Sequence, residues 1–423
     1  MTQMEAVIQS KDMKRELPDG WRWMRLGEVC ELNPRRPMIQ RNDGEPTSFI
    51  PMEAIDAVSG TVADLRTRPF GEIKKGYTCF SDGDVLFAKI TPCMQNGKHA
   101  IAQGLTSGIG FGTTEFHVLR PSGNICPEWI HFFVRQPAFL HEATEHFTGA
   151  VGQQRLPQDF LARHSIPLPP LSEQQRIAAT LRDQMASVEK ARTAAQERLE
   201  AVKSLPAALL RKIFPQPGQP LPDGWQCGPI GSVAKVQGGY AFKSEWFSNK
   251  GIRLLRNTNI FQDQIVWKDV QFLPLSLRSD FPAYELNVGD IVLALDRPFV
   301  SAGLKIAKLS EADTPSLLVQ RVGRFRIHGE VLSDFFFYFL HSQNFISAIT
   351  GHDYSLGVPH ISPDQVESIC IPLPSLSVQE QIVEKLKGQI TFVEKARSAA
   401  EEELATIDAL PAALLRRAFS GEL

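Results

Sequence analysis

The stretch VEKARTAAQERLEAVKSLPAALLRKIF occupies residues 188–214, and VEKARSAAEEELATIDALPAALLRRAF repeats it at 393–419. The two copies are identical at 17 of 27 positions and lie 205 residues apart. Upstream of each copy, SIPLPPLSEQQRI at 165–177 is echoed by CIPLPSLSVQEQI at 370–382. Because this period far exceeds the roughly 20–50 residues of stacked-repeat proteins, the pattern indicates a two-fold duplication and not a solenoid.

The duplication extends into the segments that precede the helices. LPDGW at 17–21 returns at 221–225 and predicts a Pro-Asp-Gly turn anchored by tryptophan. The apolar runs in GDVLFAKITP (83–92) and GDIVLALDRP (289–298) follow turns and are too short for helices, so they predict strands. Each copy is therefore expected to be a mixed α/β module followed by a long helix.

Two aromatic-rich segments are expected to form amphipathic helices at equivalent places in the modules. They are EWIHFFVRQPAFLHEA at 128–143 and VLSDFFFYFLHSQNFISAIT at 331–350. Their phenylalanines are interpreted as core residues, because apolar side chains at helical spacing usually pack inside a domain. Stacking on nucleic-acid bases is the alternative.

Each long helix carries apolar residues at alternating spacings of three and four, a seven-residue period sustained over four heptads. This period predicts a coiled-coil seam, and a helix lying on its own domain is the alternative. Both copies place an arginine at the same seam position, where a polar residue costs stability but fixes register and orientation. We expect the helices to pair antiparallel over about 45–50 Å. The predicted seam consists of Leu181, Met185, Val188, Arg192, Leu199, Val202, Leu386, Ile390, Val393, Arg397, Leu404 and Ile407.

The ends of each helix also have sequence signals. Ser172 with Gln175, and Ser377 with Glu380, predict capping boxes at the helix starts. Prolines at 206 and 411 are expected to interrupt the helices, so that each PAALL begins a further short helix. This terminal piece is expected either to pack against the helix root or to form a contact surface for a partner.

The predicted fold class is α+β, with two duplicated α/β modules separated by two long helices that form an antiparallel coiled coil. The expected divisions are an N-terminal extension (1–16), a first module (17–165), a central helical region (166–216), a second module (217–370) and a C-terminal helical region (371–423).

Composition is that of an ordinary soluble protein, with 43% hydrophobic residues, 22% charged residues and a formal net charge of −2. No apolar run is long enough for a membrane span, and the N-terminus lacks the apolar core of a secretory leader. Scattered cysteines without C-x-x-C spacing predict buried thiols in a reducing cytoplasm and not a disulfide framework or a zinc site. They are Cys30, Cys79, Cys93, Cys126, Cys227 and Cys370.

Motifs for catalysis are missing from the sequence. There is no phosphate-binding G-x-x-x-x-G-K-[ST] loop and no Gly-rich dinucleotide fingerprint after a strand. HEATEH at 141–146 has the wrong spacing for a zinc helix, and NPRRP at 33–37 lacks the second proline and aromatic residue of an amino-methyltransferase motif. We predict no catalytic residue and no metal site.

Polar and basic residues gather in loops that lack acids, including the thirty residues between Asp84 and Glu115. Arg, Lys, Asn and Gln side chains hydrogen-bond to base edges, and the cations also neutralise phosphates, so these loops predict contact with nucleic acid. The loops differ almost completely between the modules, which indicates two variants of one recognition task; drift after duplication is the alternative. The candidate DNA-binding residues are Lys89, Thr91, Gln95, Asn96, Lys98, Thr113, Gln153, Gln154, Arg155, Lys250, Arg253, Arg256, Asn257, Arg297, Lys305, Gln320, Arg321 and Arg324.

The duplicated arrangement resembles the specificity subunits of type I restriction–modification systems. IPLPPLSEQQRI and IPLPSLSVQEQI carry the resemblance with their downstream VEKAR helices, and GTTEFHVLRP at 112–121 adds to it. The resemblance implies that each module is a target-recognition domain reading one half of a bipartite, asymmetric double-stranded DNA target. It also implies that the paired helices set the spacer between the halves.

The same resemblance implies partners in the cytoplasm and none in a membrane. The helices would dock two methyltransferase subunits that bind S-adenosylmethionine and methylate adenine, and motor–nuclease restriction subunits with ATP would join for cleavage. This chain would bind no cofactor itself. The alternatives are a non-catalytic coiled-coil scaffold, a stand-alone DNA-binding protein, and an enzyme acting on nucleic acid without partners.

Overall fold

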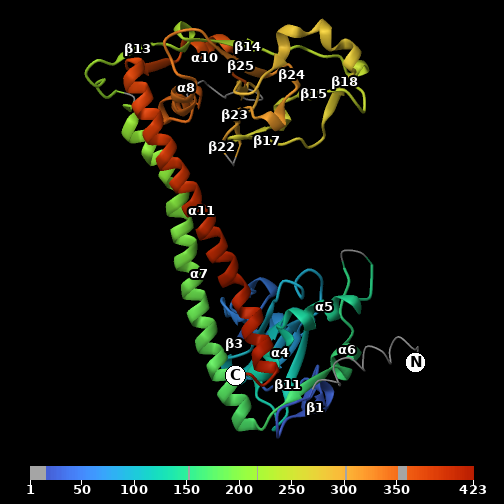
Figure 1. Ribbon diagram of the computed structural model, residues 1–423. Coiled ribbons are helices and arrows are strands. Elements are labelled where there is room, and N and C mark those ends of the chain that lie inside the picture. The colour runs from blue at the N-terminus through green and yellow to red at the C-terminus, as the bar shows by residue number, and fades with distance from the viewer. Residues whose placement is uncertain (1–15, 151–152, 217, 301–302, 351–359) are drawn as a thin grey trace. The chain divides into compact units, whose positions relative to one another are not determined.

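The chain folds into two compact units, each containing one globular module and parts of both long helices (Figure 1). The computed structural model describes residues 16–150, 153–216, 218–300, 303–350 and 360–423. Unit 1 comprises Met1–Gln196 with Glu402–Leu423, and unit 2 comprises Glu197–Glu401. Apart from Glu16, the predicted N-terminal extension lies outside the described residues. Each long helix is thus divided between the two units.

Module 1, the part of unit 1 outside the long helices, is built on two four-stranded sheets. One has the order β6-β3-β10-β7, in which β3 and β10 are parallel and the other pairs antiparallel. The other has the order β2-β11-β8-β9 and is antiparallel throughout. A two-stranded ladder of β1 and β12 joins the entry of the module to its exit, and β4 pairs with β5. The strands are β1 (Arg22–Arg25), β2 (Cys30–Leu32), β3 (Pro46–Ile50), β4 (Ile55–Asp56), β5 (Thr61–Val62), β6 (Arg66–Pro69), β7 (Thr78–Ser81), β8 (Val85–Ala88), β9 (His99–Ile101), β10 (Ile109–Gly112), β11 (Phe116–Pro121) and β12 (Ser165–Leu168).

Module 2, the corresponding part of unit 2, has the same topology. Its sheets are ordered β18-β15-β24-β19, again with one parallel pair, and β14-β25-β20-β23. The β13–β26 ladder repeats the β1–β12 ladder, the β16–β17 pair corresponds to β4–β5, and one short pair, β21–β22, is added. The strands are β13 (Gln226–Pro229), β14 (Ala234–Gly238), β15 (Ile252–Leu255), β16 (Ile260–Phe261), β17 (Gln264–Ile265), β18 (Gln271–Leu273), β19 (Glu285–Leu286), β20 (Ile291–Ala294), β21 (Phe299–Val300), β22 (Gly303–Leu304), β23 (Ile306–Lys308), β24 (Ser316–Leu318), β25 (Val322–Ile327) and β26 (Cys370–Leu373).

The shared topology confirms the duplication predicted from the repeats. The two apolar runs after Gly-Asp turns form β8 and β20, and every residue of both strands is buried. The two LPDGW segments form turns in which the tryptophan N–H donates to the proline carbonyl at 3.1 Å. Gly20 and Gly224 sit in the left-handed region, with φ of 81° and 80°, which glycine adopts without a steric cost.

Each predicted aromatic helix is in fact two short helices. In module 1 they are α4 (Pro127–Val134) and α5 (Pro137–Glu145), and in module 2 α8 (Ser333–Leu340) and α9 (Gln343–Thr350). In module 1, Pro137 begins the second helix, because proline is tolerated in a first turn but not in a helix interior. Other short helices are α2 (Leu26–Val29), α3 (Phe70–Ile73), α6 (Gln158–Arg163) and α10 (Pro363–Ser368).

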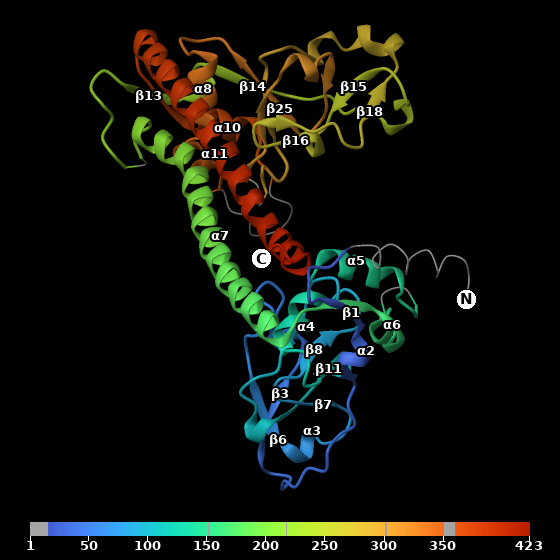
Figure 2. The same cartoon turned by 60° about the horizontal axis from the view of Figure 1, so that its bottom comes forward.

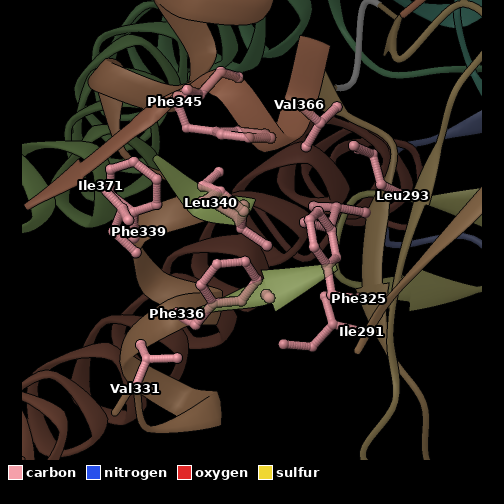
Figure 3. Close-up of a cluster of buried hydrophobic side chains, with 14 of the residues drawn as sticks. Ile291, Leu293, Phe325, Val331, Phe336, Phe339, Leu340, Phe345, Val366 and Ile371 are labelled. Carbon is pink, nitrogen blue, oxygen red and sulfur yellow. The ribbon is translucent and has the colours of Figure 1, made fainter. Parts of the chain in front are cut away.

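The aromatic residues of these helices form the cores, as predicted. Figure 3 shows Phe336, Phe339 and Phe345 in one cluster with Ile291 and Leu293 of β20. The three phenylalanines are fully buried. Since these rings are enclosed by protein, the alternative of base stacking is wrong for them.

The two long helices are α7 (Leu171–Ile213) and α11 (Leu376–Phe419) (Figure 1). Both begin one residue before the predicted capping serines, which therefore lie inside the first turn, and the predicted capping boxes are wrong. Both also continue through Pro206 and Pro411. A proline removes one backbone hydrogen bond, but the turns that follow are held by buried side chains such as Leu210 and Leu415. At 43 and 44 residues each helix is about 65 Å long, more than predicted.

The helices pair antiparallel, because opposite ends meet in each unit. In unit 1, Leu181 near the start of α7 shares a core cluster with Phe419 at the end of α11. In unit 2, Phe214 after the end of α7 shares a cluster with Leu386 near the start of α11. All predicted seam residues are buried or half-buried except Arg397, which is exposed and lies 3.8 Å from Glu401 of its own helix. Arg192 instead reaches across to α11, where its Nε donates to Asp408 Oδ1 at 2.8 Å.

The terminal PAALL segments pack against the modules at the roots of the helices, which was the first of the two alternatives. Phe419 lies 4.3 Å from Trp129 of α4 between ring centroids, and Figure 2 shows α4 beside the first turns of α7. In unit 2, Phe214 lies 5.4 Å from Phe335 of α8. The repeated segment therefore closes the core of a module in both units.

The cysteines depart from the prediction in one pair. Cys227 on β13 and Cys370 on β26 form a disulfide with a Cα–Cα distance of 5.9 Å. Antiparallel pairing brings them together across 143 residues of sequence, a proximity that their scattered spacing does not reveal. The expectation of buried thiols is therefore wrong for this pair, which is exposed and disulfide-bonded. Cys30, Cys79, Cys93 and Cys126 are free.

Candidate nucleic-acid interface

In module 1, three segments far apart in sequence converge where β8 ends. The Lys89 N–H donates to Glu115 O at 2.9 Å, just before β11. The Leu156 N–H donates to Lys89 O at 2.8 Å, and the Thr91 N–H to Gln154 O at 3.1 Å. We call Lys89, Thr91, Glu115, Gln154 and Arg155 the Arg155 cluster. The backbone thus places four of the predicted DNA-binding residues in one group.

A two-point ion pair organises the charges of the Arg155 cluster. Arg155 Nε and Nη2 donate to Glu115 Oε2 and Oε1 at 2.9 and 2.7 Å. The hydrogen bonds from Arg155 lower the pKa of the Glu115 carboxyl, so it stays charged at neutral pH. The Arg155 side chain remains 42% exposed, so the guanidinium is both oriented and open to a ligand.

Module 2 repeats this convergence with different side chains. The Leu295 N–H donates to Arg321 O and the Ile361 N–H to Leu295 O, both at 2.9 Å, at the positions of the Lys89 bonds in module 1. Asp296 then has two side-chain partners: Arg321 Nη1 lies 2.7 Å from Oδ2, and His360 Nδ1 lies 2.5 Å from Oδ1. We call Asp296, Arg297, Arg321 and His360 the Asp296 cluster.

The backbone at this cluster is unusual. Arg297 and Arg321 both adopt left-handed conformations, with φ of 43° and 69°. Such conformations cost non-glycine residues about 1–2 kcal/mol each and tend to concentrate at functional sites. The Arg321 side chain is 64% exposed and Arg297 is exposed. Both guanidinium groups are therefore available at the surface.

The remaining candidates divide into exposed and internally bonded side chains. Asn257 and Thr113 are half-buried; Asn257 donates to Asp296 O at 3.0 Å and accepts from Lys305 at 3.0 Å. Thr113 accepts a hydrogen bond from the Glu115 N–H at 3.2 Å, next to the Arg155 cluster. The exposed candidates are Gln95, Asn96, Gln153, Lys250 and Gln320.

Two candidates are buried and cannot reach a ligand at the surface. Arg324 is fully buried, where it donates to Asp290, to Gln237 and to the carbonyls of Ala283 and Glu285. Lys305 is 8% exposed, and burial lowers the pKa of its ammonium group. For both residues the DNA-binding prediction is wrong, because the side chain is buried and donates its hydrogen bonds to other groups of the module.

Three further candidates are partly exposed but support their own module. Lys98 donates to the carbonyls of Met52 and Ile55. Arg253 stacks on Trp267 at 4.3 Å and donates to Ala312 O. Arg256 donates to Asp269 O. These contacts hold the three cationic side chains against their own module. Each side chain therefore has fewer hydrogen-bond donors left for a ligand.

Sequence reasoning missed the acidic and histidine members of both clusters. The criterion was a loop without acids, whereas Glu115 and Asp296 orient Arg155 and Arg321, and His360 bonds to the same Asp296. A signal was present, because Arg155 and His360 are separated by the repeat shift of 205 residues. Only the paired strands reveal that these positions lie beside the ends of β8 and β20.

Two further properties concern the residues that the structure describes. Among them no group of three or more His, Cys, Asp or Glu side chains is arranged to hold a metal ion. Every helix in the described parts of the chain is too short or too polar to span a bilayer. The fold and the two clusters thus define a class, a duplicated binding protein with two similar modules on a pair of long antiparallel helices.

Comparison with known proteins identifies the family. The model of the type I restriction modification DNA specificity domain matches twice, at residues 18–198 and 222–400. The specificity subunit of the type I restriction enzyme EcoAI from Escherichia coli is 34% identical, over 95% of this chain and 84% of its own length. That of MjaVIII from Methanocaldococcus jannaschii is 30% identical, over 91% of this chain and 90% of its own. The chain belongs to the type I restriction modification DNA specificity family.

Solved structures share the fold at lower sequence identity. A chain from a study of complex assembly and conformational transition of the type I R-M system has a TM-score of 0.79 at 23% identity. The match covers 96% of this chain and all of that one. The HsdS subunit from Thermoanaerobacter tengcongensis has a TM-score of 0.64 at 22% identity, with coverage of 97% and 99%.

Proposed function

We propose that this chain is the DNA sequence-specificity subunit of a type I restriction–modification complex. Each module reads one half of a split double-stranded target through the residues around its cluster. The single observation that carries the proposal is that the Arg155 and Asp296 clusters share backbone hydrogen bonds but differ in side chains. An unchanged backbone with exchanged polar groups is what two readers of different base sequences require.

The chemistry of the exposed side chains supports DNA as the ligand. Arg155, Arg297 and Arg321 present guanidinium groups that can bond to guanine edges in the major groove or to phosphates. Gln153 and Gln320 add carboxamides, which suit adenine. The net charge of −2 places the attraction for DNA in local groups of cations and not in the chain as a whole.

The partners and cofactors follow from the family and the repeated helices. Two methyltransferase subunits bind the two repeated helix segments, 188–214 and 393–419, and restriction subunits join them. S-adenosylmethionine and ATP are bound by those subunits, and this chain is a non-catalytic cytoplasmic recognition subunit. The retention of these segments, against divergence of the loops, supports identical partners on the helices and different DNA at the modules.

A module exchange tests this function. The chain is expressed with its methyltransferase subunits, and methylated adenines in cellular DNA are mapped by single-molecule sequencing. Residues 17–165 are then replaced by the first module of another family member. We expect a bipartite target of which one half changes and the other half and the spacer do not.

The reciprocal exchange of residues 217–370 is the matched control and should change only the other half. A target that changes in both halves after either exchange contradicts independent reading by the modules. DNA binding that does not weaken with salt would contradict the assignment of phosphate contacts. Methylation by this chain without its partner subunits would contradict the non-catalytic role.

A further inference from the structure

Two glutamines at the starts of the long helices are fully buried. Gln174 is the fourth residue of α7 and Gln379 the fourth of α11, and both have 0% exposure. They lie in the motifs SEQQ and SVQE, in which the residues on either side of the buried glutamine differ. Glutamine is seldom buried completely, so these positions require a specific set of hydrogen bonds.

In unit 1, the Gln174 carboxamide bonds to three backbone groups. Its Oε1 accepts from the Cys126 N–H at 3.0 Å, at the N-cap of α4. Its Nε2 donates to Asn124 O at 3.0 Å and to Pro169 O at 2.9 Å. Both amide hydrogens and the carbonyl oxygen are therefore satisfied.

In unit 2, Gln379 makes the same three bonds. Its Oε1 accepts from the Leu332 N–H at 2.9 Å, at the N-cap of α8. Its Nε2 donates to Glu330 O at 3.1 Å and to Pro374 O at 3.0 Å. The partners match those of Gln174 in position, so the duplicated modules share one joint.

This joint connects three elements at one point. The segment leaving β12 or β26, the first turn of the long helix and the start of α4 or α8 all bond to one carboxamide. The rest of the joint is apolar, with Ile177 and Leu181 in unit 1 and Val383 and Leu386 in unit 2. Apolar contact is not directional, whereas three hydrogen bonds to one planar group fix an angle.

We propose that Gln174 and Gln379 are positioning residues that fix the direction in which each long helix leaves its module, and thereby the one spacer length the complex accepts. The proposal rests on the proposed function, because a spacer exists only if two modules read two half-targets. It concerns residues that contact neither DNA nor a reacting group.

The two joints differ in one supporting contact. Trp129 Nε1 in unit 1 donates to Pro167 O at 2.9 Å and so adds a second tie between α4 and the exit strand. The equivalent residue in unit 2 is Phe335, whose ring has no donor. Loss of Gln379 should therefore loosen its joint more than loss of Gln174.

The test uses Gln174→Met and Gln379→Met, since methionine keeps the length and unbranched shape of glutamine but cannot donate to the carbonyls. Each variant is assembled with its methyltransferase subunits and given DNAs with both half-targets intact and spacers one base pair shorter, unchanged or one longer. The methylation rate on altered spacers is divided by the rate on the natural spacer. We expect this ratio to rise about ten-fold for Gln379→Met, as for loss of about one net hydrogen bond, and less for Gln174→Met.

The matched controls are Gln175→Ala and Gln381→Ala, which remove exposed glutamines from the same turns. Their ratios should equal that of the unaltered complex. If the glutamine variants instead lose methylation equally on all three spacers, the residues are merely structural and the proposal is overturned. An unaltered complex with no spacer preference would contradict the proposed function itself, which separates the two failures.

A variant that does not assemble with its methyltransferase subunits can still be tested by measuring a distance within the free chain. Spin labels on unnatural amino acids at exposed positions 96 and 189, both in unit 1, report the angle between module 1 and α7. Gln174→Met should broaden the distance distribution, whereas Gln175→Ala should not. Equal widths in the two variants overturn the proposal.

Discussion

The two modules hold the same loops together with different charges. In module 1 an arginine from the loop before α6 meets a glutamate at the start of β11, as Arg155 and Glu115. In module 2 the position of Glu115 is taken by Arg321 and that of Arg155 by His360, and both turn to Asp296 beside β20. In each cluster the acid pairs with an arginine, Glu115 with Arg155 and Asp296 with Arg321. The comparison teaches that the shared backbone hydrogen bonds define the site. The acid and the arginine of the ion pair can come from different positions around it, since the acid is Glu115 before β11 in module 1 and Asp296 after β20 in module 2.

A second difference lies inside the sheets. Arg324 on β25 pairs in register with Val292, and Val118 on β11 pairs with Leu86, so the two side chains occupy equivalent places. Val118 belongs to an apolar cluster, whereas Arg324 is fully buried among hydrogen-bond acceptors. Module 2 thus depends on a buried charge where module 1 depends on packing.

The largest effect we predict tests that dependence. Arg324→Ala removes a donor from Asp290, from Gln237 and from two carbonyls, and removal of one partner from a buried ion pair costs about 3–5 kcal/mol. Val118→Ala removes two methyl groups and should cost about 1–3 kcal/mol. Hydrogen exchange of β25 and β11, read by mass spectrometry in each variant, measures both losses. Equal losses of stability in the two variants would contradict the idea that module 2 depends more on Arg324 than module 1 does on Val118.

The histidines predict a difference in acid stability. His131 and His99 are buried in module 1; burial, with Arg135 nearby, lowers the pKa of His131 to about 4 and that of His99 well below its usual value. The unfolded chain therefore binds more protons below pH 6.5, and stability falls as the pH drops from 6.5 towards 4. At pH 5 the loss is about 2 kcal/mol for His131 alone. Hydrogen exchange of α4 at pH 7.5 and 5 should show it.

Module 2 should respond to acid in the opposite sense at His341, which is half-buried. Burial alone would lower the pKa of His341, but its ion pair with Asp263 at 2.6 Å raises it above the usual value. Its stabilising contribution is complete below pH 6.5 and is lost as the pH rises through the folded pKa. We expect α8 to keep its protection at pH 5. His131→Gln should reduce the acid sensitivity of α4, whereas His141→Gln, at an exposed position, should not.

The sequence could predict those parts of the fold that local pattern decides. The duplication, the buried strands β8 and β20 and the seam of the helices all follow from periodicity and repeated residues. Helix ends were less accessible, because the turns beyond Pro206 depend on the buried side chain of Leu210 in a core that local pattern does not show. Gln174 looks like any polar residue in a helix, and only the backbone groups around it explain its burial.

The candidate site was less predictable for a related reason. Acid-free loops that are rich in cations contain Arg155 and Arg321, which reach the surface. The same criterion also selects Arg324, which lies on β25 and is fully buried. Whether an arginine reaches solvent depends on the face of the strand and on distant acceptors such as Ala283 O. The acids that orient the useful arginines were excluded by the criterion used to find them. A high density of cations in a sequence therefore predicts that a binding surface exists better than it predicts which residues form that surface.

The Arg155 and Asp296 clusters are expected to act on separate halves of the target. Arg155→Ala should weaken recognition of one half, and Arg321→Ala of the other, each by about 1–3 kcal/mol if the guanidinium reads a base. Base preferences are measured by methylation of DNA libraries randomised in one half at a time. Lys243→Ala, at an exposed cation of module 2 outside the cluster, is the control and should leave both preferences unchanged. A change in the same half for both arginine variants would show that the equivalence of the clusters is not functional.

The smallest effect concerns the helices, where one of the charge differences between the two copies lies at the position of Asp408. Arg192 pairs with Asp408, but the residue of α7 equivalent to Asp408 is Lys203, so Arg397 has no matching acid at that repeat position. Both members of the Arg192–Asp408 pair are more than 40% exposed, which limits its contribution to about 0.2–1 kcal/mol. A double-mutant cycle with Arg192→Ala and Asp408→Ala should measure this coupling by urea unfolding. Lys203→Asp should add a coupling of similar size with Arg397; if it does not, the helices pair with different geometry in the two units.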